Sequence, residues 1–266
     1  MQAEPFIRTG AFVGVFLLMA AWEFAAPRRV QAIGRLSRWP HNLGLLIVDT
    51  LLVRVLFPAA ALGAAVFSQT RGWGLLNLVA APAWLEVVLA LIVLDLAIYA
   101  QHVLFHRAPV LWRLHRVHHA DLEFDVTTGV RFHPVEIVLS MLFKLALVTA
   151  LGASPLAVLA FEVLLNATTM FNHANVRMPV AADRVLRWFV VTPDMHRVHH
   201  SILRRETDSN FGFNIPWWDR LFGTYRAQPE AGHDGLTIGL DSFRSRSELR
   251  LDRLLLQPLR QDDQGR

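Results

Sequence analysis

Long apolar stretches fill the first two-thirds of the chain, and polar residues separate and follow them. A transmembrane helix needs about 20 mostly apolar residues to cross roughly 30 Å of hydrocarbon. Five stretches meet this requirement, at approximately 9–26, 43–67, 81–101, 134–152 and 154–172. The turn Gly152-Ala153-Ser154-Pro155 joins the last two closely enough to form a helical hairpin. The pattern predicts an all-α, integral-membrane helix bundle with four to five transmembrane helices.

The same pattern divides the chain into three parts within one continuous domain. Residues 1–80 are expected to form N-terminal membrane helices, and residues 81–227 hold the remaining spans together with most of the histidines. Residues 228–266 form a polar C-terminal tail, which we expect to be weakly structured apart from an amphipathic helix near 246–256. No Pro-, Gly- or Ser-rich linker marks off a second globular unit.

Composition supports a membrane protein, since 53% of the residues are hydrophobic and only 18% are charged. Soluble proteins usually carry nearer a quarter charged residues. The net charge of +4 comes from arginines in loops that flank the apolar stretches, without a basic stripe interleaved with aromatic residues, so no nucleic acid is expected as a partner. Arginine-rich loops face the cytoplasm, which predicts an outside N-terminus, five crossings and a cytoplasmic histidine-rich cap of short helices.

Two charged residues within the last two spans are predicted to form an ion pair. Lys144 and Glu162 each lie nine residues from Ala153, at the turn of the predicted hairpin. Antiparallel helices therefore place them at the same depth, where an unpaired charge is costly. We interpret the pair as a packing device rather than as part of a reaction site.

Histidines carry the chemistry of this chain, because it contains no cysteine and any metal must bind through nitrogen or oxygen. His102 and His106 are four residues apart at the end of the third span, and the pentapeptide His-Arg-Val-His-His occurs at both 115–119 and 196–200. Residues i, i+3 and i+4 share a helix face, so each copy is expected to present three imidazoles to one point. Two such triplets can close around two metal ions. The predicted ligands are His102, His106, His115, His118, His119, His173, His196, His199 and His200.

Two further residues are weighed as metal ligands or as partners that orient the ligands. His133 stands alone before Pro134, and we favour a role as a donor behind the ligands over one as a tenth ligand. Asp95 lies seven residues before His102 on nearly the same stripe, where it can orient a ligand. Imidazole binds zinc, copper, iron or nickel, so the histidines alone do not choose the metal. His41 and His233 are interpreted as ordinary polar residues.

These motifs resemble the fatty acid hydroxylase / sterol desaturase superfamily of membrane di-iron enzymes. The family's HxxxH, HxxHH and later HxxHH are matched by His102-Val-Leu-Phe-His106, His115-Arg-Val-His-His119 and His196-Arg-Val-His-His200. Residues 81–227 are therefore interpreted as the hydroxylase-like domain. Further similar segments are Arg131-Phe-His-Pro134, Asn172-His173-Ala-Asn175 and Trp218-Asp-Arg-Leu-Phe-Gly-Thr-Tyr225.

The resemblance implies a pair of iron ions that use dioxygen to hydroxylate or desaturate a C–H bond of a sterol, fatty acyl or related lipid. Zinc can replace the iron in purified protein. Electrons must come from a separate ferredoxin or b-type cytochrome with its reductase, for which arginines near the cluster offer either a docking surface or membrane contacts. These arginines are Arg113, Arg116, Arg197, Arg204 and Arg205.

The sequence departs from some relatives at Thr169, four residues before His173, where a second histidine stands in them. His133, a water or a carboxylate then completes the coordination, or one metal has fewer ligands. The competing function is a histidine-rich membrane protein that binds or transports metal, but a transporter needs ligands near the midplane. We place the protein in a bacterial inner (cell) membrane with the cluster on the cytoplasmic side. The walls of the substrate pocket are expected from spans 1, 2 and 5, without selective polar groups.

Overall fold

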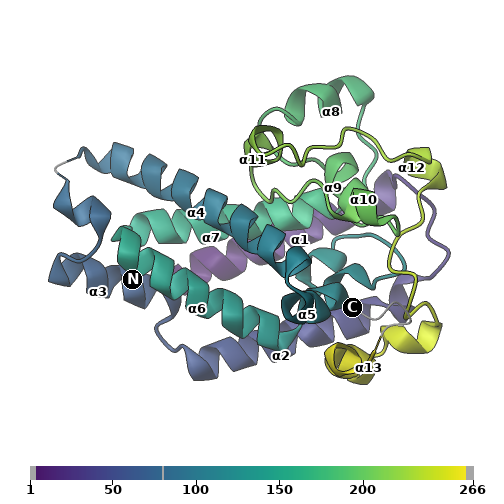
Figure 1. The fold of residues 1–266 in the computed structure, drawn as a ribbon, viewed down its shortest axis with the longest axis horizontal. Coiled ribbons are helices and arrows are strands. Elements are labelled where there is room, and N and C mark those ends of the chain that lie inside the picture. Colours follow the sequence, from purple (N-terminus) through teal and green to yellow (C-terminus); the bar gives the residue numbers. More distant parts are fainter. Residues whose placement is uncertain (1–3, 80, 262–266) are drawn as a thin grey trace.

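The computed structural model describes residues 4–79 and 81–261, which contain helices and no strand. Long helices run side by side and most of the short helices gather at one end, the right-hand end in Figure 1. The long helices are α1 (Glu4–Ala25), α2 (Trp39–Leu56), α4 (Ala83–Arg107), α6 (Pro134–Leu151) and α7 (Pro155–Asn172). We refer to the end that carries the short helices as the cap.

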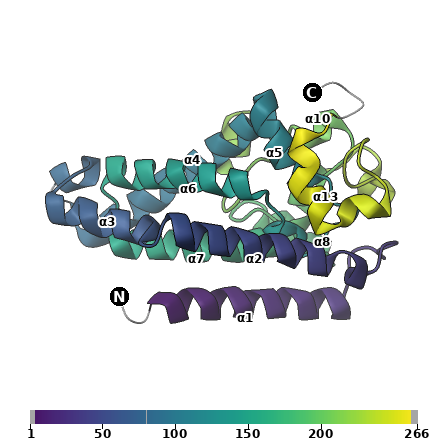
Figure 2. The same ribbon diagram turned by 90° about the horizontal axis from the view of Figure 1, so that it is seen from below.

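Among the described residues, five segments are long and apolar enough to cross a membrane, as the sequence predicts. Large apolar side chains such as Leu17, Leu51 and Leu142 are exposed on their outer faces, where lipid would cover them. The ends of α1, α4 and α7 and the starts of α2 and α6 all lie at the cap, which agrees with five crossings. Figure 2 shows α1 on the outside of the bundle.

The second predicted span is not one helix. The structure divides it into α2 and α3 (Ala60–Arg71), with a break at Phe57 and Pro58. Proline removes a backbone N–H and restricts the residue before it, so a helix ends there. The short helix α3 packs on α6 and α7 at the end of the bundle far from the cap.

The turn between α6 and α7 forms as the sequence predicts. Gly152 ends α6 with a φ of 69°, and the Ser154 hydroxyl caps the start of α7. The backbone at Gly74, in the turn after α3, approaches Gly152 so closely that a Cβ at Gly74 would lie 2.2 Å from the Gly152 nitrogen. Both positions therefore require glycine. Beside this turn, Leu94, Val148, Val158 and Phe161 form a buried apolar core.

The predicted ion pair within the hairpin is confirmed. Lys144 Nζ donates to Glu162 Oε1 across 3.0 Å. The sequence did not reveal that Arg8 of α1 also binds Glu162, nor that Arg8 pairs with Glu4. The result is a network of two cations and two carboxylates that links α1, α6 and α7.

The cap consists of α5 (Pro109–His119), α8 (Val180–Leu186), α9 (Pro193–His199), α10 (Arg204–Thr207), α11 (Trp217–Leu221), α12 (Gly232–Gly235) and α13 (Leu251–Leu256), with short 3-10 turns between them. The C-terminal segment is bound to the cap, contrary to the expectation of a weakly structured tail. Leu254 of α13 is fully buried against Leu45 and Val117. Arg116 donates to the backbone carbonyls of Gln257 and Arg260, which holds this segment against α5.

Candidate metal centre

The structure brings all nine predicted histidine ligands together in the interior of the cap. They form two groups in which every member offers a ring nitrogen within 4.8 Å of the others. All nine side chains are buried. The five-histidine group contains His102, His106, His115, His119 and His199, and the four-histidine group contains His118, His173, His196 and His200.

Each His-Arg-Val-His-His copy contributes to both groups, so the expectation that each copy faces one point is wrong. In the first copy, His115 and His119 join the five-histidine group while His118 joins the other. In the second copy, His196 and His200 join the four-histidine group while His199 crosses over. Successive helical residues turn by about 100°, so i and i+4 are about 40° apart and i+3 points about 100° away from i+4. One motif therefore serves two adjacent sites.

The two groups are adjacent. The ring of His119, in one group, stacks on that of His200, in the other, with centroids 4.5 Å apart. Phe132 stacks against His118 at 4.5 Å, and Phe124 stacks against His173 at 5.5 Å. Two aromatic side chains thus cover part of the four-histidine group.

Hydrogen bonds fix the orientation of four of the rings. In His102, His173 and His199, Nδ1 lies 2.7 Å from the backbone carbonyl oxygen of Phe211, Thr169 and Ser209, respectively. A carbonyl oxygen only accepts, so Nδ1 carries the hydrogen and Nε2 keeps a free lone pair. In His115, Nδ1 donates to Oε1 of Glu136 at 2.7 Å. Orienting contacts of this kind are typical of histidines that bind metal.

The resulting lone pairs face one another. Nε2 of His102 lies 3.1 Å from Nε2 of His115 and 3.1 Å from Nε2 of His199. Since Nδ1 holds the hydrogen in all three rings, no hydrogen is available between these atoms. Three lone pairs at this separation repel one another unless a cation lies among them. The donor set therefore fits a metal ion.

Burial keeps the imidazoles in the form that binds metal. It lowers the pKa of His115 and the pKa of His173 to about 3. Burial, reinforced by neighbouring histidines, also lowers the pKa of each of five other rings well below the ordinary value. A neutral imidazole is the ligand form. The five are His118, His119, His196, His199 and His200.

A loop held by Asp219 supports two of the ligands. Its carboxylate accepts the backbone N–H groups of Phe211 and Gly212 at 2.8 and 2.9 Å. The carbonyl of Phe211 binds His102, as described above, and the carbonyl of Ser209 binds His199. Asp219 therefore acts through the loop, which gives a structural reason for the Trp218–Tyr225 motif.

A buried ionic cluster ties the first span-to-span loop to the cap. Arg38 donates to Asp121 at 2.7 Å and to Asp125 at 2.6 Å, and all three side chains are fully buried. The Arg38 guanidinium holds the pKa of each carboxyl below its ordinary value, despite burial. Asp121 follows the first His-Arg-Val-His-His copy by two residues, so the cluster fixes the end of α5.

His133 and Asp95 have other partners. His133 Nδ1 accepts the Val135 backbone N–H, which caps α6, and Nε2 donates to the Leu255 carbonyl at 3.2 Å. It belongs to neither histidine group and donates to no ligand among the described residues. Asp95 accepts from Trp218 Nε1 at 2.8 Å instead of from a histidine. The carboxylate that orients a ligand is Glu136, three residues after His133, which the sequence interpretation overlooked.

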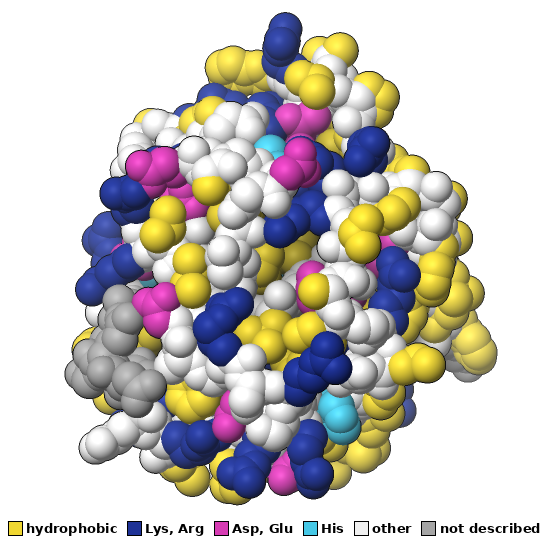
Figure 3. Space-filling model, turned by 90° about the vertical axis from the view of Figure 1, so that its right-hand side faces the viewer, with side chains coloured by type: hydrophobic (Ala, Val, Ile, Leu, Met, Phe, Trp, Pro, Cys, Tyr) yellow, Lys and Arg dark blue, Asp and Glu magenta, His cyan; other side chains and the backbone are white. Residues whose placement is uncertain are grey.

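Two of the five arginines expected at a docking surface are fully buried. Arg116 binds backbone carbonyls of the C-terminal segment, and Arg197 pairs with Asp194 beneath Phe124. Arg204 and Arg205 are exposed. Figure 3 looks onto the cap, where arginine side chains are spread over the surface and almost no histidine is visible.

Fold and site together define a membrane protein with two buried histidine groups that could hold metal ions, and sequence comparison gives the family. The profile described as "Fatty acid hydroxylase" matches residues 87–224, more than half of the chain. The chain therefore belongs to the fatty acid hydroxylase family. Comparison with solved structures gives no match.

Curated relatives include lipid-modifying enzymes from bacteria and vertebrates. Ornithine lipid hydroxylase OlsE of Rhizobium tropici is 35% identical over 165 residues, 59% of this chain and 46% of the relative. Human alkylglycerol monooxygenase is 29% identical over 150 residues, which are 56% of this chain and 32% of the relative. Human cholesterol 25-hydroxylase is 27% identical over 146 residues, which are 53% of this chain and 51% of the relative. The chain thus spans about half or less of these relatives.

Proposed function

We propose that this chain is a membrane-bound di-iron oxygenase that hydroxylates or desaturates a C–H bond of a lipid. The observation that carries the proposal is the pair of buried histidine groups, whose free lone pairs face one another beneath a cavity that reaches into the membrane bundle. The named activities of the relatives support an oxygenase that acts on lipids.

The five-histidine group is assigned to one iron and the four-histidine group to the other. His173 belongs to the smaller group, and Thr169 four residues before it contributes only a backbone carbonyl to the His173 ring. The departure from the histidine found in some relatives therefore falls on the group with fewer ligands. We infer that an iron held by this group would have fewer histidine ligands than one held by the five-histidine group.

The side chains of the chain bind, orient and shield the metal pair. Iron, when bound, supplies the activation of dioxygen and the abstraction of hydrogen from an unactivated carbon. His102, His115 and His199 hold fixed lone pairs toward it because their other ring nitrogens are engaged. Phe124 and Phe132 exclude water from the four-histidine group.

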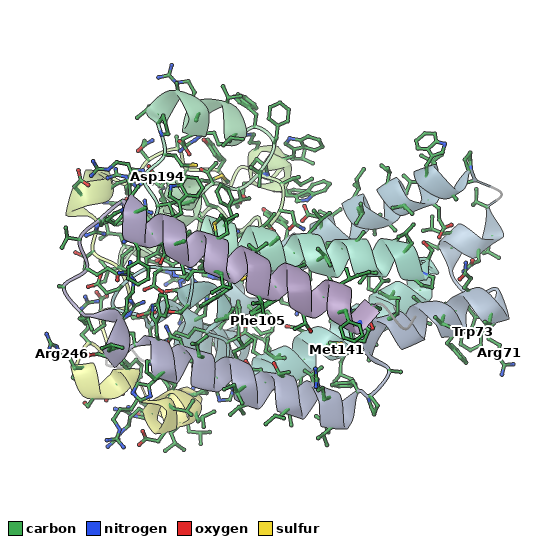
Figure 4. The ribbon with its side chains drawn as sticks, turned by 180° about the vertical axis from the view of Figure 1, so that it is seen from behind. Arg71, Trp73, Phe105, Met141, Asp194 and Arg246 are labelled. Carbon is green, nitrogen blue, oxygen red and sulfur yellow. The ribbon has the colours of Figure 1, made fainter. Side chains whose placement is uncertain are left out.

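A cavity of about 1080 Å³ connects the membrane bundle with the histidines. His102, His115 and Phe213 lie at one end, and Lys144 and Glu162 lie toward the other. Helix α1 packs on α7 while α2 packs on α6, and the cavity lies between these pairs. Residues of both α1 and α2 line the cavity, and Figure 4 labels two further residues of its wall, Phe105 and Met141. We propose that a lipid enters the cavity sideways from the bilayer, between α1 and α2.

The proposal also includes an external electron donor and an orientation of the protein in the membrane. A separate ferredoxin or b-type cytochrome supplies the electrons and docks on the basic face of the cap, where Arg204 and Arg205 are exposed. The loop arginines favour a cytoplasmic cap in a bacterial inner membrane.

Mössbauer spectroscopy on anaerobically purified, iron-replete protein tests the metal assignment. The expected result is a coupled iron pair, and a His118→Ala variant serves as the control that lacks one ligand. Lipid profiling of a deletion strain, complemented with the wild type or with His118→Ala, tests the reaction. An oxygenated or unsaturated lipid that returns only with the wild type is expected. A protein without a coupled iron pair, or a lipid profile unchanged by the deletion, contradicts the proposal.

A further inference from the structure

The cavity has a carboxylate that no cation balances. Asp49 of α2 lines the cavity and is 6% exposed. Within the described ranges, 4–79 and 81–261, it makes no hydrogen bond or ion pair, and its Oδ1 atom is fully enclosed. An ionisable side chain at membrane depth is rare and is normally paired or functional. A buried polar group without a partner therefore indicates a ligand that the protein alone does not supply.

A second carboxylate faces the same part of the cavity. Glu136 lines it and lies within electrostatic range of Asp49. One oxygen of Glu136 accepts from His115, and the other, Oε2, has no hydrogen-bond partner among the described residues. The two carboxylates thus form an acidic patch on the wall beside the five-histidine group.

At the opposite end of the cavity, the acidic side chains all have cation partners. Lys144 and Arg8 bind Glu162, and Arg8 also pairs with Glu4. Two cations and two carboxylates cancel, so this network requires no external charge. Arg54 also lines the cavity, but it forms no ion pair with Asp49 and is exposed. The acidic groups that have no cation partner therefore lie near the histidines.

We propose that Asp49, assisted by Glu136, binds a cationic amino group on the headgroup of the lipid substrate. An ammonium group supplies both the positive charge and the hydrogen-bond donors that the two carboxylates lack. The proposal rests on the proposed function, because it places the amino group of the substrate beside the metal ligands.

The position of Asp49 along the chain fits a role in substrate choice. The family profile matches residues 87–224 and so covers the nine histidines of the two groups and Glu136, while Asp49 lies before it on α2. The reaction machinery is therefore the part shared with the family. The residue that selects the headgroup comes from an N-terminal membrane helix outside the shared segment.

Binding of labelled dodecylamine to full-length, iron-free protein in non-ionic detergent tests the proposal at pH 7, where the amine is protonated. The wild type is expected to bind it saturably, and Asp49→Asn is expected to weaken binding by about tenfold or more, the loss of one charge-assisted contact. Dodecanol, with the same chain and no charge, is expected to bind both proteins alike. Glu4→Gln, which alters a cavity carboxylate that already has Arg8, is expected to change amine binding less than about twofold.

Two outcomes overturn the proposal. Equal dodecylamine binding by the wild type and Asp49→Asn does so, and so does a parallel loss of dodecanol binding, which indicates a structural or hydroxyl-binding role. Asn is isosteric and removes an unpaired buried carboxylate, so the melting temperature is not expected to fall. Asp49→Glu, which keeps the charge, is expected to retain part of the affinity. No turnover is measured, so failure here leaves the oxygenase proposal intact, and failure of the oxygenase test leaves this result interpretable.

Discussion

The Nε2 atoms of His102 and His199 lie 3.1 Å apart, although 97 residues separate them in the chain. His102 lies in the last turns of a long membrane helix, and His199 belongs to a seven-residue helix of the cap. Both rings donate from Nδ1 to carbonyls of the loop that Asp219 holds. Membrane helix, cap helix and loop therefore determine this contact together.

Removing one histidine is expected to affect the two groups unequally. His173→Ala reduces the four-histidine group to three, and His199→Ala reduces the five-histidine group to four. We expect iron retention, measured by elemental analysis after chelator dialysis, to fall further in His173→Ala. His233→Ala is the control because that buried ring lies outside both groups. Equal retention in all three variants would contradict the cluster.

Glu136→Gln is expected to weaken metal binding while the fold is kept. The variant loses the negative charge that accepts from His115 Nδ1, and loss of such an orienting partner typically costs about 10–100-fold in metal affinity. Competition with a graded series of chelators measures the change. Asp252→Asn, on the exposed surface of α13, should match the wild type. An unchanged affinity in Glu136→Gln would show that the contact does not support the site.

Arg38→Met is expected to destabilise the cap by roughly 3–5 kcal/mol, because Asp121 and Asp125 lose their shared buried cation. In the wild type, both carboxyls have a pKa below that of the unfolded chain, near 3.9. Their contribution to stability is therefore complete above about pH 4 and is lost as the pH falls further. The variant should instead gain stability as acid protonates the unpaired carboxyls.

Thermal unfolding midpoints test this contrast. They are measured for both proteins between pH 8 and pH 4, with size-exclusion chromatography after heating as the readout. Arg250→Met removes an exposed pair with Asp252 and serves as the control, with almost no effect expected. Parallel pH profiles for the wild type and Arg38→Met would refute the assignment.

Within the hairpin, Glu162→Gln is expected to destabilise the protein more than Lys144→Met. Glu162 balances both Lys144 and Arg8, whereas Lys144→Met leaves Glu162 paired with Arg8. Removing the partner that two buried cations share costs on the order of 3 kcal/mol of stability, because both cations lose that partner. Melting temperatures in detergent measure the order, and the double variant should lose less than the sum of the single losses. The reverse order would show that Arg8 does not stabilise Glu162.

Hydropathy alone was sufficient to predict the hairpin and the spans, except for the break before Pro58 in the second one, since the bilayer imposes the length and composition of these segments. The spacing of His102, His106 and the two His-Arg-Val-His-His copies likewise predicted which side chains meet. The division of each copy between two groups follows from helix geometry, which the sequence interpretation applied to one face only. To predict this division, one has to take into account that successive side chains on a helix are rotated by about 100°.

The remaining errors concern partners that are distant in sequence. Asp95 and Glu136 are both acidic residues near a histidine, and only the fold shows that Trp218 binds the first and His115 the second. The buried states of Arg116 and Arg197 could not be predicted either, because their partners are backbone carbonyls, an aromatic ring and Asp194. The polar groups of the cavity, absent from the predicted pocket walls, face inward on helices that otherwise contact lipid.

The loop held by Asp219 also constrains how the protein is made. The ligands begin at His102, but the carbonyls that orient His102 and His199 belong to residues 211 and 209, and Asp219 must be present to hold them. All five membrane helices precede these residues in the chain. Translation of these helices therefore finishes before the binding geometry exists, so any metal that the histidines bind has to be acquired late in biogenesis.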